Sequence, residues 1–490
     1  MSWAVAAGHE ATAEAAAEVL RAGGTAVDAC IAGAFMAGVS EPILASLLGG
    51  GFLMVATEQG APRCLDFFVE TPGSKPAEGD LDIREILADF GTTTQGFHIG
   101  AGTVAVPGVI PGLFAAHEAY GRLPMSELAA QAVGTAKTGL VLTPFQARLL
   151  CIVEPIVQAS SGTRVLFTDD GKPLEAGRRF ANPALADVME TLVAEGVRFG
   201  TEGEIAGALA SLPGTALRRE DMAAYRPEWR VPRMVERNGF GVALNPGPSL
   251  GGVQIALALG ALPHNPGVSD IASCFAAILD QRHLGDETLF DPETVEALAV
   301  LLRKRAAKRG TTHISAVDAQ GNGAALTLSN GEGCGLVLPG TGLMPNNMLG
   351  EEDLLPDGPS SWRAGERLAS MMCPTAIRGT EGGLTMLGSG GSNRIRTALT
   401  QVIVNLVDRG MTLEEAILAP RLHVDGAPAR LDAEGTLGEA DRDALRRDWP
   451  EAVFWEEQSM FFGGVHAVTT DARGVQAIGD PRRAGAVRIG

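Results

Sequence analysis

The residues with the clearest chemical potential are Gly310, Thr311 and Thr312, where a helical pattern gives way to a strand pattern. Glycine tolerates strained backbone, and a peptide bond next to a β-hydroxyl must be strained before it can rearrange. The hydroxyl of Thr311 could therefore attack the carbonyl carbon of Gly310 and break the chain between these two residues. The alternative interpretation is a glycine that ends a helix, followed by two threonines that open a strand.

A second motif with chemical potential is the glycine-rich segment 388–392. Convergent backbone N–H groups stabilise the negative charge that develops on a carbonyl oxygen during acyl transfer, and glycine lets them approach closely. Gly390 and Gly391 are the best candidates for these donors, and Gly391 with Ser392 is the alternative pair. The segment lacks the lysine of a phosphate-binding loop. A plain turn at the exit of a hairpin is the other interpretation.

The elements that would position these residues can be read from periodicity and turn residues. Helical patterns cover residues 10–22, 25–39, 112–137, 182–212, 253–309, 394–409 and 412–419. Strand patterns cover residues 52–57, 62–69, 236–245, 313–329, 376–387 and 464–478. The chain is therefore mainly helical up to residue 309 and strand-rich afterwards, which predicts an α+β fold with helices on antiparallel sheets.

Short motifs along nearly the whole chain occur in an order that identifies a family. They are residues 8–42, 49–52, 105–108, 120–124, 221–226, 248–252, 284–286, 310–315, 317–322, 339–342, 346–348, 374–375 and 388–392. In this order they resemble the γ-glutamyltranspeptidase family of the N-terminal-nucleophile hydrolase superfamily. The resemblance implies an αββα sandwich, with two antiparallel sheets between helical layers, formed jointly by both cleavage products.

The resemblance also implies a self-cleaving enzyme. Cleavage between Gly310 and Thr311 would give a large piece, 1–310, with strands near 50–70 and 236–245, and a small piece, 311–490. Thr311 would then be the nucleophile of an acyl-enzyme and its own α-amine the base, since such an amine has a pKa of about 7.7–8. Ser329 stands where the family has a threonine that contacts the nucleophile. Asn330, or Gly331 in an ungapped match, stands near an asparagine that steadies the α-amine.

The resemblance breaks where the family binds the glutamyl group of its donor by charge. Val69 stands where an arginine would pair with the α-carboxylate, so a strong charge-assisted contact is missing. Met371 stands where the family has a second serine after Ser370. The candidate substrate-binding residues are Val69, Asn330, Asn347, Met348, Glu352, Asp353, Ser370, Met371 and Ser392.

Three functions follow from these observations. The main expectation is an amide hydrolase or acyltransferase that acts on a γ-glutamyl or related amide. The first alternative is an acylase or amidase for a less charged acyl group. The departures from the family pattern at Val69 and Met371 affect substrate choice and leave the cleavage chemistry intact. The second alternative is a non-catalytic family member that never cleaves itself and serves in binding.

Composition limits the partners. The net charge of −19 argues against nucleic acid, and no apolar stretch is long enough to span a membrane. No metal or organic cofactor is expected, because the histidines and the six cysteines show no ligand-like spacing. We expect a small-molecule amide substrate, water or an amine as acceptor, and a heterodimer of the two pieces that could itself dimerise. With no signal peptide visible, we expect a cytoplasmic location.

Overall fold

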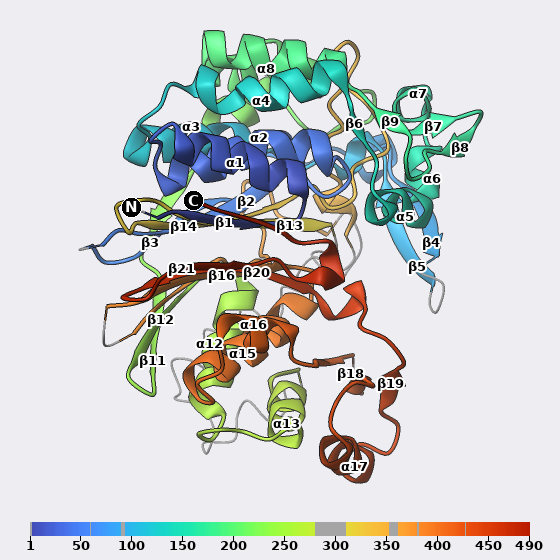
Figure 1. Ribbon diagram of the computed structural model, residues 1–490. Helices are drawn as coiled ribbons and strands as arrows, with labels where there is room; N and C mark the ends of the chain where they lie inside the picture. Colours follow the sequence, from blue (N-terminus) through green and yellow to red (C-terminus); the bar gives the residue numbers. More distant parts are fainter. Residues whose placement is uncertain are drawn as a thin grey trace.

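Two antiparallel sheets packed face to face form the centre of the computed structural model, and a layer of helices covers the outer face of each (Figure 1). The structure describes residues 2–58, 60–89, 94–279, 310–351, 361–379, 382–426 and 428–490. The predicted helical stretch 253–309 is therefore described only as far as residue 279, and the motif at 284–286 lies outside the described residues. The four-layer arrangement confirms the expected αββα sandwich.

The first sheet has seven strands and is built from both ends of the chain. In spatial order its strands are β10 (Glu228–Arg230), β3 (Arg63–Phe67), β2 (Gly50–Ala56), β14 (Gly323–Ser329), β13 (Thr311–Val317), β1 (Ala4–Ala7) and β22 (Ala486–Ile489). The terminal strands β1 and β22 pair with each other, so the two chain ends lie side by side (Figure 1).

The second sheet has six strands. In spatial order they are β11 (Arg233–Arg237), β12 (Phe240–Leu244), β15 (Thr375–Arg378), β16 (Leu384–Gly390), β20 (Gly464–Asp471) and β21 (Gly474–Ile478). The single strand predicted over 236–245 was wrong, because Asn238 and Gly239 both have positive φ and turn the chain into a hairpin. Asn-Gly is a strong hairpin signal, and it should have divided the predicted strand.

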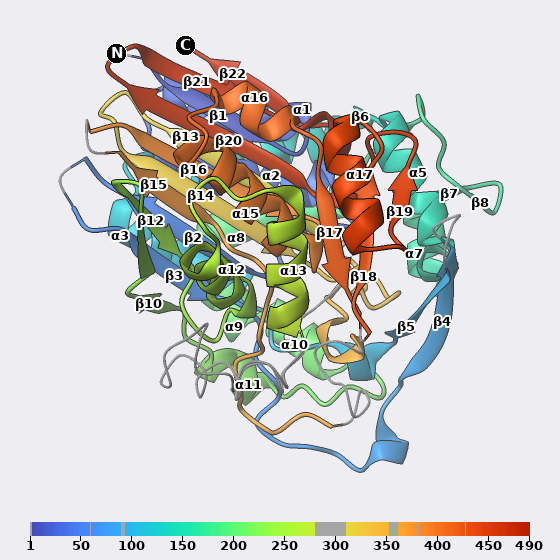
Figure 2. The same cartoon turned by 90° about the horizontal axis from the view of Figure 1, so that it is seen from below.

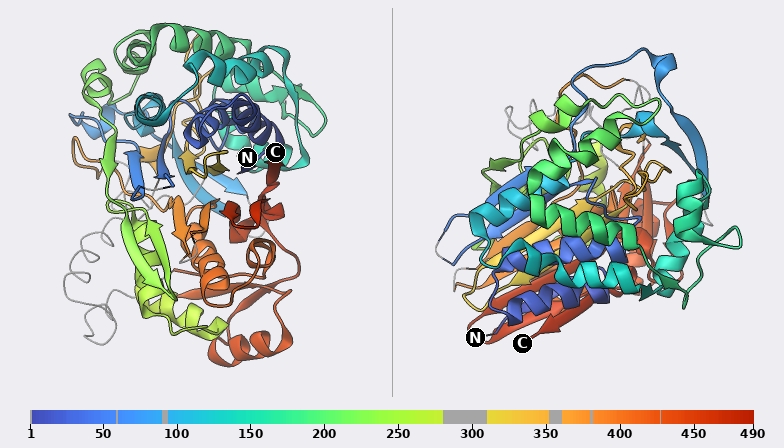
Figure 3. Two further views of the ribbon diagram at one scale, coloured as in Figure 1. Left: turned by 60° about the vertical axis from the view of Figure 1, so that its left-hand side comes forward. Right: turned by 90° about the horizontal axis from the view of Figure 1, so that it is seen from above.

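Helices cover the outer face of each sheet. Over the first sheet lie α1 (Glu10–Arg21), α2 (Ala26–Ser40) and α3 (Val109–Tyr120), while α4 (Met125–Thr138) packs on α1 and α2 and α8 (Pro183–Glu195) packs on α4 (Figure 3, right). Over the second lie α12 (Leu250–Ala261), α15 (Arg394–Val407) and α16 (Leu413–Leu418) (Figure 2), and α13 (Val268–Leu279) packs against α12 on the side away from the sheet (Figure 1). Thr25 caps α2 in a reciprocal capping box with Asp28, at the start of the helical pattern predicted from residue 25.

The remaining elements surround this sandwich. The helices are α5 (Pro144–Ile152), α6 (Glu154–Val157), α7 (Ser161–Phe167), α9 (Val197–Thr201), α10 (Glu204–Ala210), α11 (Arg219–Ala224) and α17 (Glu439–Asp448). The strands are β4 (Arg84–Asp89), β5 (Thr94–Ile99), β6 (Leu140–Val141), β7 (Thr168–Asp169), β8 (Lys172–Pro173), β9 (Arg179–Phe180), β17 (Leu422–Asp425), β18 (Arg430–Glu434) and β19 (Val453–Trp455). Short 3-10 turns include η3 (Met348–Gly350), η4 (Met460–Phe462) and η5 (Pro481–Arg483). Within the described ranges, none of the helices has the length and apolar character that crossing a membrane requires.

Candidate active site

Thr311 is the first residue of β13, and its side chain faces the interior between the two sheets. Strand residues alternate between faces, so Thr311 and His313 share one face while Thr312 shares the other with Ile314. The inner face is identified by His313, which packs against Gly388 of the second sheet, and the outer face by Ile314, which packs against α2. Thr311 stands opposite Ser329 in the ladder between β13 and β14, so both hydroxyl residues lie at the same end of the hairpin.

The peptide that precedes Thr311 has the backbone that only glycine adopts comfortably. Gly310 has φ +39°, and a Cβ added there would lie 1.5 Å from the carbonyl oxygen of Gly331. The Ser329 hydroxyl donates a hydrogen bond of 2.6 Å to the Gly310 carbonyl oxygen. This bond polarises the carbonyl that a Thr311 hydroxyl would attack, so the sequence-predicted Gly310, Thr311 and Ser329 form one chemical unit.

The glycine-rich turn lies directly against this unit. A Cβ added to Gly390 would lie 2.3 Å from the Thr311 carbonyl oxygen, so the turn approaches the nucleophile as closely as backbone allows. Gly391 and Ser392 both have positive φ, +125° and +61°, and α15 begins immediately after them. A helix N-terminus favours negative charge, so the turn suits a developing oxyanion. Gly391 is common to both predicted donor pairs.

A pocket of about 200 Å³, counted with space open to solvent, adjoins Thr311. It is lined by Phe68, Thr311, Ser329, Ser370, Met371, Met372, Ser392 and Ile395. The pocket therefore brings together five residues selected from the sequence, namely Thr311, Ser329, Ser370, Met371 and Ser392. They come from four separate segments of the chain. In the part of the chain that the structure describes, none of the lining side chains is charged.

Val69 does not line this pocket, contrary to the prediction that it binds substrate. It is fully buried, its amide and Cγ1 face Gly50, and its carbonyl accepts a hydrogen bond from the Leu368 amide at 3.1 Å. The neighbouring Phe68 lines the pocket in its place. A strand-like segment alternates its side chains, and the sequence pattern did not show which of the two faces inward.

Asn330, Asn347 and Met348 also lie behind the pocket wall. The Asn330 side chain donates to the Met344 carbonyl at 3.3 Å, and the Asn347 side chain accepts from the amides of Glu332 and Gly333 at 2.9 and 3.3 Å. Met348 is fully buried in the core. The Asn330 and Asn347 side chains therefore hold the turn that follows β14 and Ser329.

The predicted acids are only partly placed. Glu352 and Asp353 lie outside the described residues. Glu351, which precedes them, is buried, and its Oε1 lies 2.9 Å from the position that a Cβ of Gly331 would occupy. One carboxylate therefore lies beside the turn that carries Ser329.

Arg367 is a buried cation near the pocket that sequence reasoning missed. Its guanidinium forms ion pairs with Glu70 at 2.7 Å and Asp66 at 3.2 Å. It also donates to the Tyr225 hydroxyl at 2.8 Å and the Phe68 carbonyl at 3.2 Å. These contacts engage the guanidinium in joining two pocket-forming segments. The spacing of Arg367 three residues before Ser370 was visible in the sequence, but nothing there indicated its partners.

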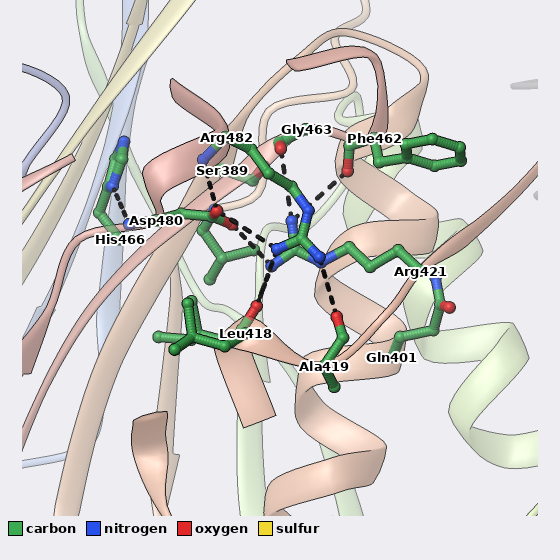
Figure 4. Close-up of polar contacts among 12 residues, drawn as sticks. Ser389, Gln401, Leu418, Ala419, Arg421, Phe462, Gly463, His466, Asp480 and Arg482 are labelled. Atoms are coloured by element: carbon green, nitrogen blue, oxygen red, sulfur yellow. Dashed lines mark hydrogen bonds and ion pairs between the residues drawn. The ribbon is translucent and has the colours of Figure 1, made fainter. Parts of the chain in front are cut away.

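A buried ion-pair cluster stabilises the start of β20 and the glycine-rich turn (Figure 4). Arg421 pairs with Asp480 at 2.7 Å and donates to the Gly463 carbonyl at 3.3 Å. Arg482 pairs with Asp480 at 3.3 Å and with Glu434 at 2.6 Å. Burial alone would raise the pKa of Asp480, but the two guanidinium groups hold it below its ordinary value. Gly463 packs against Ser389 and Gly390, so the ion-pair cluster stabilises the position of the glycine-rich turn.

His313 is a structural residue, as its neighbours show. Its ring nitrogens lie 2.8 Å from the hydroxyls of Thr327 and Ser315, both within the β13–β14 hairpin. Burial holds the pKa of His313 well below its ordinary value, so the ring is neutral. Among the described residues, no group of three or more His, Cys, Asp or Glu side chains is arranged to hold a metal ion.

The chain matches the family described as Gamma-glutamyltranspeptidase over residues 12–273 and 271–489. The acylase ACY 1 proenzyme of Pseudomonas sp. (strain SE83) is 30% identical over 484 residues, covering 89% of this chain and 85% of that protein. The glutathione hydrolase proenzyme of Pseudomonas aeruginosa is 28% identical over 536 residues, covering 98% and 93%.

The fold has close counterparts among solved structures. The crystal structure of cephalosporin acylase from Bacillus halodurans has a TM-score of 0.80 at 22% identity, covering 99% of this chain and 95% of that one. At this identity the likeness concerns the fold.

Proposed function

Because the chain belongs to the γ-glutamyltranspeptidase family, whose chemistry is amide hydrolysis and acyl transfer, we propose that Thr311 is its nucleophile and that it cleaves its own chain at Gly310–Thr311. The observation that carries this assignment is the contact set around one peptide bond. The Ser329 hydroxyl holds the Gly310 carbonyl at 2.6 Å, and the turn at Gly390 packs against Thr311.

Self-cleavage would proceed by an acyl shift within the chain. The Thr311 Oγ1 attacks the carbonyl carbon of Gly310, the carbon–nitrogen bond breaks, and the former amide nitrogen takes up a proton as the α-amine of Thr311. Water then hydrolyses the resulting ester. The products are 1–310 with a carboxylate at Gly310, and 311–490 with a free Thr311. Ser329 donates to the carbonyl oxygen as it gains charge.

The cleaved enzyme would use the same hydroxyl on an external amide. The neutral α-amine of Thr311 accepts the hydroxyl proton as Oγ1 attacks the substrate carbonyl. Two amides from Gly390, Gly391 and Ser392 donate to the oxyanion. The substrate's carbon–nitrogen bond breaks, its amine leaves with a proton, and water or a second amine takes the acyl group from Thr311.

We assign the acyl group to an uncharged class. The described pocket lining offers three serine hydroxyls, the hydroxyl of Thr311 and the apolar side chains of Phe68, Met371, Met372 and Ile395. Arg367, the buried cation nearby, is engaged by Glu70 and Asp66. A carboxylate would lose its hydration in such a pocket without gaining a partner. A γ-glutamyl group is the second candidate, and Glu351 favours it because a carboxylate could hold an α-amine.

The two pieces would remain together as a heterodimer, which could itself dimerise. The relatives are proenzymes by name, and both sheets of this chain contain strands from each side of residue 310. Separation would therefore break the ladders between β1 and β13, β2 and β14, and β12 and β15.

Denaturing electrophoresis of purified wild type and Thr311→Ala tests the cleavage. We expect two bands for wild type and one full-length band for the variant. A single full-length band for wild type would favour the non-catalytic alternative. Edman sequencing of the smaller band should begin at Thr311, and any other first residue would refute the assignment.

A matched set of p-nitroanilides tests the acyl class. The γ-glutamyl, glutaryl and pentanoyl amides share a five-carbon chain and differ only in their charged groups. We expect kcat/KM to be highest for the pentanoyl amide. A preference for the γ-glutamyl amide would overturn the uncharged assignment and support the second candidate, without affecting the nucleophile.

A further inference from the structure

The nucleophile lies on a part of β13 that is paired on one side only within the described sheet. β14 pairs with all of β13, from Thr311 to Val317. On the other side, β1 pairs only with Ile314 to Val317, because it ends at Ala7. The segment 311–313 therefore needs another anchor where β1 is missing.

The Glu41 carboxyl anchors this segment on the face of the sheet that α1 and α2 cover. Glu41 follows the last turn of α2 and is buried. Its Oε2 accepts a hydrogen bond of 2.7 Å from the hydroxyl of Thr312, and its Oε1 accepts one of 3.0 Å from Thr12 of α1. A Cβ on Gly8 would lie 2.7 Å from the Thr312 hydroxyl and 2.8 Å from Glu41. Only glycine at this position leaves room for the two groups to meet.

The charged and titratable groups around Glu41 come from three other elements. Arg483 of η5 attracts the carboxylate, and its terminal nitrogens lie 3.2 and 3.4 Å from the Cβ positions of Gly391 and Gly390. His466 of β20 faces the same glycine, Gly8, at 3.6 Å. His9, which caps α1, completes the set.

Only Glu41 among these four groups is expected to change charge between pH 6.5 and pH 8. Burial raises the pKa of Glu41 to about 7, against the hydrogen bonds from Thr312 and Thr12. Burial lowers the pKa of His466 to about 4 and that of His9 below its ordinary 6.5. Burial lowers the pKa of Arg483 to about 10, so it keeps its charge.

We propose that Glu41 is a positioning residue for Thr311, and that its ionised carboxylate, through Thr312, holds the start of β13 in the geometry that self-cleavage requires. This inference rests on the proposed function. A proton on Glu41 removes the negative charge that strengthens the hydrogen bonds from Thr312 and Thr12, because a charged acceptor binds a hydroxyl donor more strongly than a neutral one does. Thr12 has a second partner in the Ser40 hydroxyl at 2.9 Å, so the contact with Thr312 is the one whose loss affects the site.

Self-cleavage is the reaction in which to test this role, because the α-amine of Thr311 does not exist before the chain breaks. The chain is synthesised in a cell-free system at pH 6, shifted to a series of pH values up to 8, and followed by electrophoresis. With a pKa of about 7, the ionised fraction of Glu41 rises about tenfold between pH 6 and pH 8. We expect the wild-type cleavage rate to rise by about the same factor.

Glu41→Gln keeps the shape without the charge, and we expect it to cleave at no more than about one tenth of the wild-type rate at pH 8, with a flat profile. Thr312→Val should also flatten the profile, and Thr312→Ser should restore the rise. Thr12→Val removes the other donor and should keep the rise. These variants separate an effect on β13 from a general loss of packing.

The outcomes distinguish this inference from the proposed function. A Glu41→Gln or Thr312→Val chain that cleaves with the wild-type pH profile overturns the positioning role and leaves Thr311 as the nucleophile. A wild-type chain that never cleaves overturns the proposed function itself. A Thr12→Val profile as flat as that of Glu41→Gln would place the effect in α1 and would also overturn the role of Thr312.

Discussion

Replacement of Ser329 by alanine should slow self-cleavage far more than it weakens the fold. In the uncleaved chain the Ser329 hydroxyl donates a 2.6 Å hydrogen bond to the Gly310 carbonyl. Such a neutral bond stabilises a folded chain by about 0.5–1.5 kcal/mol. As Thr311 attacks, the carbonyl oxygen gains negative charge, and loss of one oxyanion donor typically costs about 2.7–4 kcal/mol of transition-state stabilisation. The expected slowing is therefore about 10²–10³-fold.

The assay compares chains synthesised without cells and sampled over time by electrophoresis. Ser329→Ala should give a full-length band that is converted slowly, whereas Ser329→Thr retains a hydroxyl and should cleave at close to the wild-type rate. Thermal unfolding of the uncleaved Thr311→Ala chain, with and without Ser329→Ala, measures the effect on stability alone. Wild-type cleavage by Ser329→Ala would refute the role of this hydroxyl.

Three further outcomes are expected. Gly390→Ala places a methyl group 2.3 Å from the Thr311 carbonyl, so the p-nitroanilide kcat should fall by about 10²-fold or more; an unchanged kcat would remove this turn from the site. Arg482→Met leaves the buried Glu434 without the guanidinium that pairs with it, and the free energy of unfolding measured in urea should fall by about 3–5 kcal/mol. A fall of less than about 1 kcal/mol would refute the stabilising role of the ion-pair cluster. Because the pKa of Glu41 is raised by burial from 4.5 to about 7, its protonated form stabilises the fold below about pH 4.5. This contribution, up to about 3 kcal/mol, should disappear as pH rises to about 7, and Glu41→Gln should remove that part of the pH dependence in denaturation curves.

Local signals in the sequence predicted the elements that carry the nucleophile. The helical pattern over 25–39 and the strand pattern over 313–329 depend on neighbouring residues alone, and the structure has α2 and the β13–β14 hairpin there. The convergence of Thr311, Ser370 and Ser392 on one pocket came from the resemblance, because no local pattern relates such distant segments.

The residues that prediction misplaced depend on tertiary packing. Phe68 faces the pocket and Val69 does not, a choice that depends on how this segment packs against β2. The sequence does not indicate a role for Glu41, because a Glu-Pro pair after a helix is an ordinary end signal. Its importance comes from Thr312, 271 positions away.

Each of the two sheets contains strands from both sides of residue 310, so cleavage at that residue would have to follow folding. β13 lies between β14 and β1, and β1 lies at the opposite end of the sequence from β22, its other neighbour. A cut at residue 310 made before these ladders form would leave two fragments with exposed strand edges, which are prone to aggregate. On the proposed cleavage, the uncut peptide would therefore be a temporary tether between the two halves during folding. It would keep the two halves at high effective concentration until the strands of both sheets have paired. It would no longer be needed once the peptide at residues 310–311 has the geometry that cleavage requires.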